Sequence, residues 1–156
     1  MGNVWRTRAV FCALLPLLAA CASGPTYDQL HANEPVVAQT MGRIYMYRGG
    51  SMFGAAIQPA IKVDGVKVGE SVPGGYFYVD EPAGTYIVST ETEKEETVSV
   101  TLAAGQTVYV HFYPLPGVIV GHVIPEVMDP AKAAELIRPL HFDNGLDQDK
   151  KKSASK

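Results

Sequence analysis

Hydrophobic and polar residues alternate along most of the chain between residues 42 and 127. The clearest stretch runs from Glu95 to Leu102, where Val98 and Val100 alternate with threonine and serine. A period of two is typical of a β-strand that has one buried face. Such segments recur at a spacing of roughly ten residues, which is the rhythm of a β-sandwich or a barrel. The predicted strands cover residues 42–48, 60–63, 66–68, 76–80, 85–92, 95–102, 108–112 and 118–127.

Turn residues separate the predicted strands. Asp64-Gly65 lies between two alternating segments and indicates a tight hairpin, because both of its residues must accept a positive φ. Pro82-Ala83-Gly84 marks another turn. One short helix is predicted from Pro130 to Arg138, with Asp129 as its N-cap. The predicted fold is all-β: a small antiparallel β-sandwich of about seven to eight strands with one short C-terminal helix.

The first twenty residues have the layout of an export signal. Arg6 and Arg8 precede an unbroken apolar run from Ala9 to Ala20. As a helix this run would extend ~18 Å, well short of the ~30 Å of a bilayer core. The run ends in Leu18-Ala19-Ala20-Cys21, which resembles the lipobox of bacterial lipoproteins. We therefore predict a lipoprotein signal peptide over residues 1–20 and lipidation of Cys21.

The alternative is an ordinary secretory signal, cut at the small residues Ala20 and Ala22, that releases an unanchored protein. Acylation suits Cys21 better, because removal of residues 1–20 leaves it as the single cysteine and no intramolecular disulfide can form. Ala22 stands where an aspartate would resemble the inner-membrane retention signal. The expected location is the cell envelope, with the protein anchored by lipid to the outer membrane and facing the periplasm.

Composition divides the rest of the chain into three parts. Residues 21–40 are predicted to be a flexible tether, because prolines and Gly24 interrupt any apolar period. Residues 41–142 would form the sandwich and residues 143–156 a disordered polar tail. Without Arg6 and Arg8 the 13 basic residues fall to 11 against 16 acidic ones, which gives a net charge of −5. This charge excludes the basic surface of a nucleic-acid binder.

The loop that begins at Gly49 and Gly50 invites comparison with a phosphate-binding loop. Gly49 and Gly54 have the required spacing, but Ala55-Ala56 stands where lysine and serine or threonine are needed, so the match fails. Two interpretations of Met52 and Phe53 remain open. Their side chains either pack against the sheet or contact a partner, such as an envelope protein or a cell-wall component.

Tyrosines form the most suggestive set of side chains. Tyr45 and Tyr47 share one face of a predicted strand, as Tyr76 and Tyr78 do on another. An aromatic surface of this kind could bind a saccharide or a peptide. The alternative is that these tyrosines cover a sheet face and keep their hydroxyl groups in water.

The sequence gives little support for a catalytic site or a metal site. His111, His122 and Glu126 lie on strands that could be neighbours, yet no ligand-spacing motif accompanies them and no metal site is predicted. There is no Gly-x-Ser-x-Gly elbow, and the one cysteine of the mature chain is assigned to lipid. We therefore expect no catalytic residues, no cofactor and no enzymatic activity.

Several segments in order resemble a bacterial lipoprotein family known as domain of unknown function 2846. They are Arg43–Arg48, Ser51–Ala56, Val63–Glu70, Gly74–Val79, Pro82–Tyr86 and Leu102–Val110. The resemblance implies a small β-sandwich similar to prealbumin-like and PEGA-type modules, and it implies no activity. The function predicted is thus a non-enzymatic, membrane-anchored lipoprotein that displays an interaction module in the periplasm. The alternative is a surface-anchored binder of saccharide or peptide ligands through the tyrosine-rich face.

Overall fold

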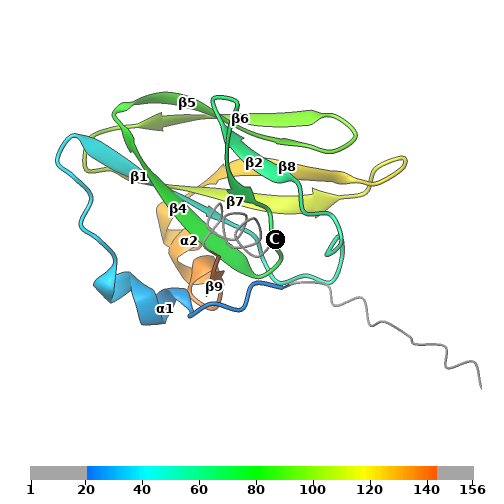
Figure 1. Ribbon diagram of the computed structural model, residues 1–156, viewed down its shortest axis with the longest axis horizontal. Helices are drawn as coiled ribbons and strands as arrows, with labels where there is room; N and C mark the ends of the chain where they lie inside the picture. Colours follow the sequence, from blue (N-terminus) through cyan, green and yellow to red (C-terminus); the bar gives the residue numbers. More distant parts are fainter. Residues whose placement is uncertain (1–20, 144–156) are drawn as a thin grey trace, which may run out of the picture.

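The computed structural model describes residues 21–143 of the chain (Figure 1). The predicted signal peptide lies outside the described residues, as does the predicted tail apart from its first residue. Between residues 21 and 143, neither α-helix has the length and apolar character that a membrane crossing requires.

Two β-sheets pack face to face, which confirms the predicted β-sandwich with a short C-terminal helix. One sheet has the order β8 (His122–Met128), β7 (Thr107–Leu115), β1 (Met41–Tyr47), β4 (Gly75–Pro82) and β9 (His141–Phe142). The other has the order β3 (Val66–Glu70), β2 (Ala60–Val63), β5 (Gly84–Glu91) and β6 (Glu95–Leu102). The helical elements are α1 (Tyr27–Leu30), the 3₁₀ turn η1 (His31–Asn33) and α2 (Pro130–Ile137).

The local turn chemistry is as predicted. Asp64 and Gly65 have φ values of 47° and 81°, so the β2–β3 hairpin turns where the dipeptide indicated. The Asp129 side chain caps α2 by accepting hydrogen bonds from the backbone N–H groups of Ala131 and Lys132, at 3.1 and 3.2 Å.

Two strand pairings in the predicted antiparallel sandwich are parallel. β1 runs parallel to β7, and β4 runs parallel to β9. The first pairing follows from the crossing between the sheets: the turn after β6 brings Gly105 against Met41, with a hydrogen bond of 2.8 Å from N–H to carbonyl. β7 therefore starts at the same end of the sheet as β1.

The last predicted long strand also needs correction, because β8 begins only at His122. The residues before it, Val118 to Val120, form an exposed bend instead. Gly121 ends this bend with a φ of 107°, a conformation that other residues rarely adopt.

The main core fills the space between the sheets, where the inward-facing side chains of all the longer strands meet. It consists of Ile44, Met46, Ile61, Val63, Phe77, Val88, Val100, Leu102, Val108, Val110, Phe112 and Val123.

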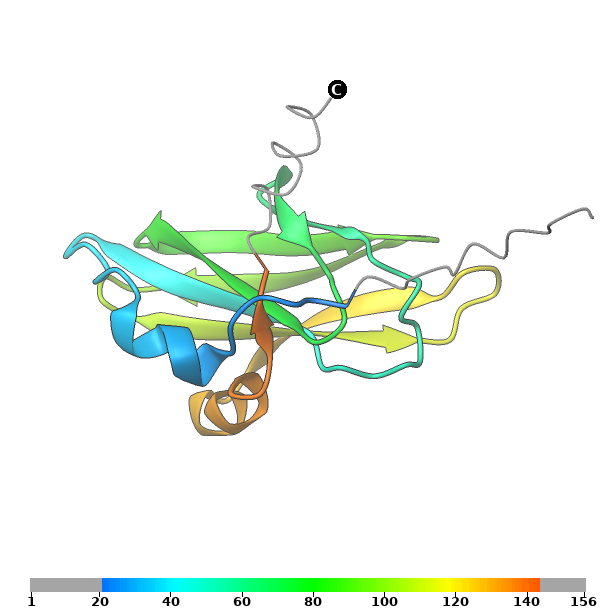
Figure 2. The same cartoon turned by 60° about the horizontal axis from the view of Figure 1, so that its bottom comes forward.

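A second core lies on the opposite face of the five-stranded sheet, beneath the helices (Figure 2). Its buried members are Tyr27, Tyr45, Tyr47, Tyr76, Ala133, Ile137 and Leu140. Because β1 is covered on both faces, all of its residues except Met41 are buried. The molecule thus has three layers, with α1 and α2 forming the third.

The N-terminal segment, predicted to be a flexible tether over residues 21–40, contains α1 and η1 and contacts the sandwich. Tyr27 is buried, and its ring lies 5.6 Å from that of Tyr45 and 5.4 Å from that of Tyr76, measured between centroids. Its backbone N–H donates to the carbonyl of Leu140 at 3.0 Å. Tyr27 is thus one of the contacts that attach this segment to the sheet, and one tyrosine leaves no periodic signal in the sequence.

Candidate functional site

The tyrosine-rich face is a buried layer. Tyr45, Tyr47 and Tyr76 are at most 2% exposed, so in this structure they are closed to a saccharide or a peptide. The hydroxyl groups of Tyr47 and Tyr76 do not lie in water, because both are buried, and burial raises the pKa of Tyr47 to about 12. Tyr78 alone of the four keeps partial exposure. The other three tyrosines are buried because Ala133 and Ile137 of α2 pack on this face of the sheet.

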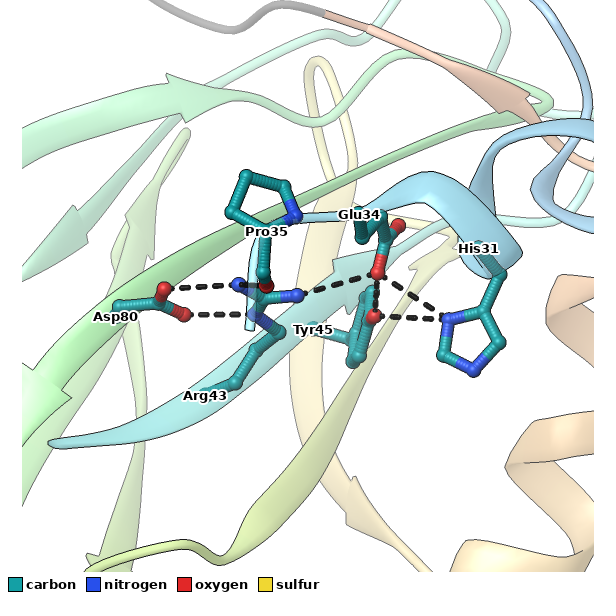
Figure 3. Close-up of polar contacts among 6 residues, drawn as sticks. All are labelled: His31, Glu34, Pro35, Arg43, Tyr45 and Asp80. Carbon is teal, nitrogen blue, oxygen red and sulfur yellow. Dashed lines mark hydrogen bonds and ion pairs between the residues drawn. The ribbon is translucent and has the colours of Figure 1, made fainter. Parts of the chain in front are cut away.

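Arg43 organises a polar cluster at the edge of the second core (Figure 3). Its guanidinium binds Asp80 with two hydrogen bonds, Nε to Oδ1 at 2.7 Å and Nη2 to Oδ2 at 2.8 Å. It also donates to Oε2 of Glu34 at 3.2 Å and to the carbonyl of Pro35 at 2.9 Å. The ring of Tyr78 lies 3.9 Å from the guanidinium carbon.

Glu34 is the second centre of the cluster, and its side chain is only 7% exposed. Its Oε2 accepts a hydrogen bond from the hydroxyl of Tyr45 and lies 3.2 Å from Nδ1 of His31 (Figure 3). Burial and the neighbouring carboxylate both raise the pKa of Tyr45, so the hydroxyl stays protonated and remains a donor. The cluster contains no activated nucleophile, and its geometry is that of a clamp that holds residues 31–35 on the sheet.

A pocket of about 170 Å³ opens beside this clamp. It is the place where Tyr78 remains accessible, and it combines apolar walls with the amide of Asn33. Its lining consists of Leu30, Asn33, Glu34, Pro35, Tyr78 and Phe142.

Exposed apolar residues gather at one end of the sandwich, which we call the apolar end. Its members come from the loop between β1 and β2, from the end of β7 and from the bend between β7 and β8, and all of them except Val118 line one shallow groove. Met52 is 82% exposed, Val118 95% and Ile119 87%, which is unusual for side chains of this type. The exposed members are Met52, Phe53, Leu115, Val118, Ile119 and Val120.

A carboxylate holds the bend of the apolar end in place. Oε1 of Glu93, from the β5–β6 turn, accepts the backbone N–H groups of Ile119 at 2.6 Å, of Gly121 at 2.9 Å and of Val120. Its Oε2 accepts the N–H of Val118 at 3.1 Å. These four donors lower the pKa of Glu93 to about 2. The successive N–H groups form an anion-binding nest that the protein fills with its own side chain.

A buried arginine holds the other loop of the apolar end. Arg48 donates to the backbone carbonyls of Ile57 at 2.5 Å, Gly54 at 2.6 Å and Ser71 at 2.9 Å. Gly54 itself has a φ of 68°, and a Cβ there would lie 2.6 Å from Cβ of Pro114. Both loops are therefore tied to the sandwich by charged side chains.

Cys21 lies close to this end of the molecule. Its thiol is free and exposed, and the next residue, Ala22, donates its backbone N–H to the carbonyl of Pro73 at 3.3 Å. A Cβ on the adjacent Gly74 would lie 3.8 Å from Cα of Gly50, where the β1–β2 loop starts. In both views the described chain begins beside that loop (Figures 1 and 2).

The three residues weighed as metal ligands are not brought together. His111 pairs with Glu126 across β7 and β8, whereas His122 pairs with Leu115 at the far end of the same ladder. The ring of His111 stacks on Tyr47 at 4.9 Å. Among residues 21–143, no three His, Cys, Asp or Glu side chains gather in a way that could hold a metal ion.

The sequence did not reveal the residues that build the polar cluster around Arg43 or the bend of the apolar end. The partners Arg43, Glu34 and Asp80 come from separate segments, and nothing local in the sequence connects them. The sequence predicts a strand at Val118 to Val120 because valine and isoleucine favour strands, whereas the structure has a bend there. Its flanking glycines, Gly117 and Gly121, were the available signal that the chain turns there.

Comparison with known proteins places the chain in a family. A protein of Haemophilus influenzae described as "Uncharacterized protein" is 27% identical over 140 residues, which cover 86% of this chain and 83% of that protein. No solved structure gives a significant match. The profile of the family described as "Protein of unknown function (DUF2846)" matches residues 38–122, from just before β1 to the start of β8. The chain therefore belongs to the DUF2846 family, as the resemblance of its strand segments indicated.

Proposed function

We propose that this chain is a non-enzymatic lipoprotein that is acylated on Cys21 and holds a β-sandwich interaction module at the bacterial membrane. The observation that carries the proposal is the order of Arg6 and Arg8, the apolar run and the segment Leu18-Ala19-Ala20-Cys21. The exposed thiol of Cys21 at the margin of the folded domain supports it, because an acyl chain there would meet no steric obstacle.

The anchor would be strong enough to determine the location. A single acyl chain gives marginal membrane binding, since each buried methylene contributes about 0.8 kcal/mol, whereas several chains on one residue hold a protein stably. Ala22 in place of an aspartate supports outer-membrane residence with the sandwich on the periplasmic side. In this proposal Met52 and Phe53, which are exposed rather than packed against the sheet, are the contact residues of the module.

The test is metabolic labelling with an alkyne fatty acid in cells that produce the full chain. Wild-type protein should become labelled and partition with membranes, and Cys21→Ala should do neither. Cys12→Ala is the matched control, because it removes the other cysteine and should label like the wild type. An unlabelled mature protein that begins at Ser23 would instead identify an ordinary secretory signal and refute the anchor.

A second candidate function is ligand binding at the pocket beside Tyr78. What favours it is the partial exposure of this tyrosine next to Asn33 and Glu34, which offer an aromatic face and polar groups to a sugar or a peptide. Addition of muropeptide fragments should then broaden or shift the NMR signals of Tyr78 but not those of Tyr86 on the other sheet. Asn33→Leu should abolish the effect, and unchanged Tyr78 signals would exclude this function.

A further inference from the structure

The apolar end exposes hydrocarbon side chains, and no polar side chain lines its groove. The groove between its two loops is lined only by glycine, alanine, proline and larger apolar residues, among them Phe53, Ile57 and Ile119. A protein interface of ordinary composition makes about one hydrogen bond per 100–200 Å² and favours Trp, Tyr and Arg as its anchors. A lipid surface requires neither, so the chemistry of this groove matches hydrocarbon better than a protein partner.

The backbone N–H groups of the bend already have hydrogen-bond partners within the protein. In lipid, each unsatisfied backbone polar group costs several kcal/mol, which normally keeps irregular loops out of membranes. Here the N–H groups of Val118, Ile119, Val120 and Gly121 all donate to Glu93. The three apolar side chains can therefore leave water while their own N–H groups stay hydrogen-bonded.

The position of the lipid attachment residue points to the same surface. Ala22 is hydrogen-bonded to Pro73, and Gly74 lies against Gly50 at the base of the Met52–Phe53 loop. The bend at Val118 to Val120 lies toward the same end in both views, whereas the segment between η1 and β1 lies at the opposite end (Figures 1 and 2). An acyl chain on Cys21 would bring the apolar end, and not the opposite one, toward the bilayer.

We propose that the apolar end inserts into the membrane interface next to Cys21, so that Met52, Phe53, Val118, Ile119 and Val120 form a second, protein-based contact with lipid. This inference rests on the proposed function for the presence of the anchor, and it names the lipid surface as the partner of Met52 and Phe53. Insertion fixes the orientation of the sandwich on the membrane. Because no basic side chain lines the groove, the contact should be insensitive to salt.

The test uses a tryptophan as a depth probe, because Trp5 is the single tryptophan of the chain and lies in the predicted signal peptide. The chain from Cys21 to Lys156 is coupled through Cys21 to a maleimide lipid in vesicles of phosphatidylethanolamine and phosphatidylglycerol with brominated acyl chains. The probe variant is Ile119→Trp. The matched control is Val36→Trp, since Val36 is 95% exposed in the segment at the opposite end.

We expect the brominated chains to quench more than half of the emission of Ile119→Trp, because interfacial residues reach ~5–10 Å into the boundary of headgroups and acyl chains. Emission from Val36→Trp should be unchanged, and added salt should alter neither result. Adding Met52→Ser and Phe53→Ser to Ile119→Trp should reduce the quenching to the control level. Val118→Trp serves as a second probe if circular dichroism shows that Ile119→Trp is unfolded.

Unquenched emission from both bend probes would overturn the inference and leave the apolar end to a protein partner. Equal quenching of Val36→Trp would also overturn it, because the sandwich would then lie on the membrane without a preferred orientation. Chemical coupling makes the result independent of acylation in cells. Failure of the lipoprotein proposal would therefore appear only in the labelling of Cys21.

Discussion

Replacement of Arg43 by methionine should destabilise the protein by about 3–5 kcal/mol, because it breaks a buried ion pair from one side. Glu34 would keep a carboxylate that is only 7% exposed and would lose its cationic partner. Asp80 contributes less to the loss, since its side chain is 30% exposed and water can replace the guanidinium. Methionine fills most of the volume of the arginine stem, so the cost of a cavity stays small.

The assays are urea denaturation and thermal denaturation of residues 21–156 carrying Cys21→Ser. Both are monitored by far-ultraviolet circular dichroism. At about 4 °C per kcal/mol for a domain of this size, the midpoint of thermal unfolding should fall by ~10–20 °C. Adding Glu34→Gln to Arg43→Met removes the stranded charge and should recover at least ~1 kcal/mol. A loss below ~1 kcal/mol for Arg43→Met, or no recovery in the double variant, would refute the idea that Glu34 is a buried charge held by Arg43.

Four further substitutions test contacts in the second core and at the apolar end. Within the described residues the hydroxyl of Tyr76 is buried without a hydrogen-bond partner, so Tyr76→Phe should leave the free energy of unfolding unchanged or raise it. Tyr45→Phe removes the hydrogen bond to Glu34 and should lower the free energy of unfolding by about 1 kcal/mol. Urea denaturation of the two variants measures the difference. Gly54→Ala should destabilise by about 1–2 kcal/mol because of its positive φ, with further loss from the contact with Pro114, and differential calorimetry measures this. Glu93→Gln should lower the protection of the amides of residues 118–121 against hydrogen exchange, measured relative to their intrinsic exchange rates at the same pH, as should acidification of the wild type. Folding lowers the pKa of Glu93 from 4.5 to about 2, so its contribution to stability is fully present above the unfolded pKa and is lost as pH falls from about 4.5 toward 2. Equal protection of these amides in wild type and variant at neutral pH would contradict this role of Glu93.

Much of the fold was predictable because its signals are local. The alternation over Glu95–Leu102 located β6 with the bounds that the structure has. Asp64-Gly65 located a hairpin, and Asp129 located the start of α2. Each of these features depends on residues that are neighbours in the sequence, so the physical cause can be read without knowing the tertiary structure.

The candidate site was less predictable because it depends on contacts between distant segments. The alternation of Tyr45 with Met46 indicates two faces but does not say that helices cover the tyrosine face. Tyr27 gives no periodic signal, and its burial depends on contact with the rings of Tyr45 and Tyr76. Likewise only the tertiary structure brings the N–H groups of the bend to Glu93.

The central position of β1 has a consequence for how the chain folds. β1 pairs with β4 on one side and with β7 on the other. The hydrogen bonding of β1 at Arg43 is therefore complete only when both Asp80 and Thr107 are in place. Such distant pairings carry a high loop-closure entropy, and proteins dominated by them fold on timescales of about milliseconds to seconds. A nascent chain that stops short of β7 would leave one edge of its central strand without a partner. The sheet therefore assembles late, after nearly all of the domain has been synthesised.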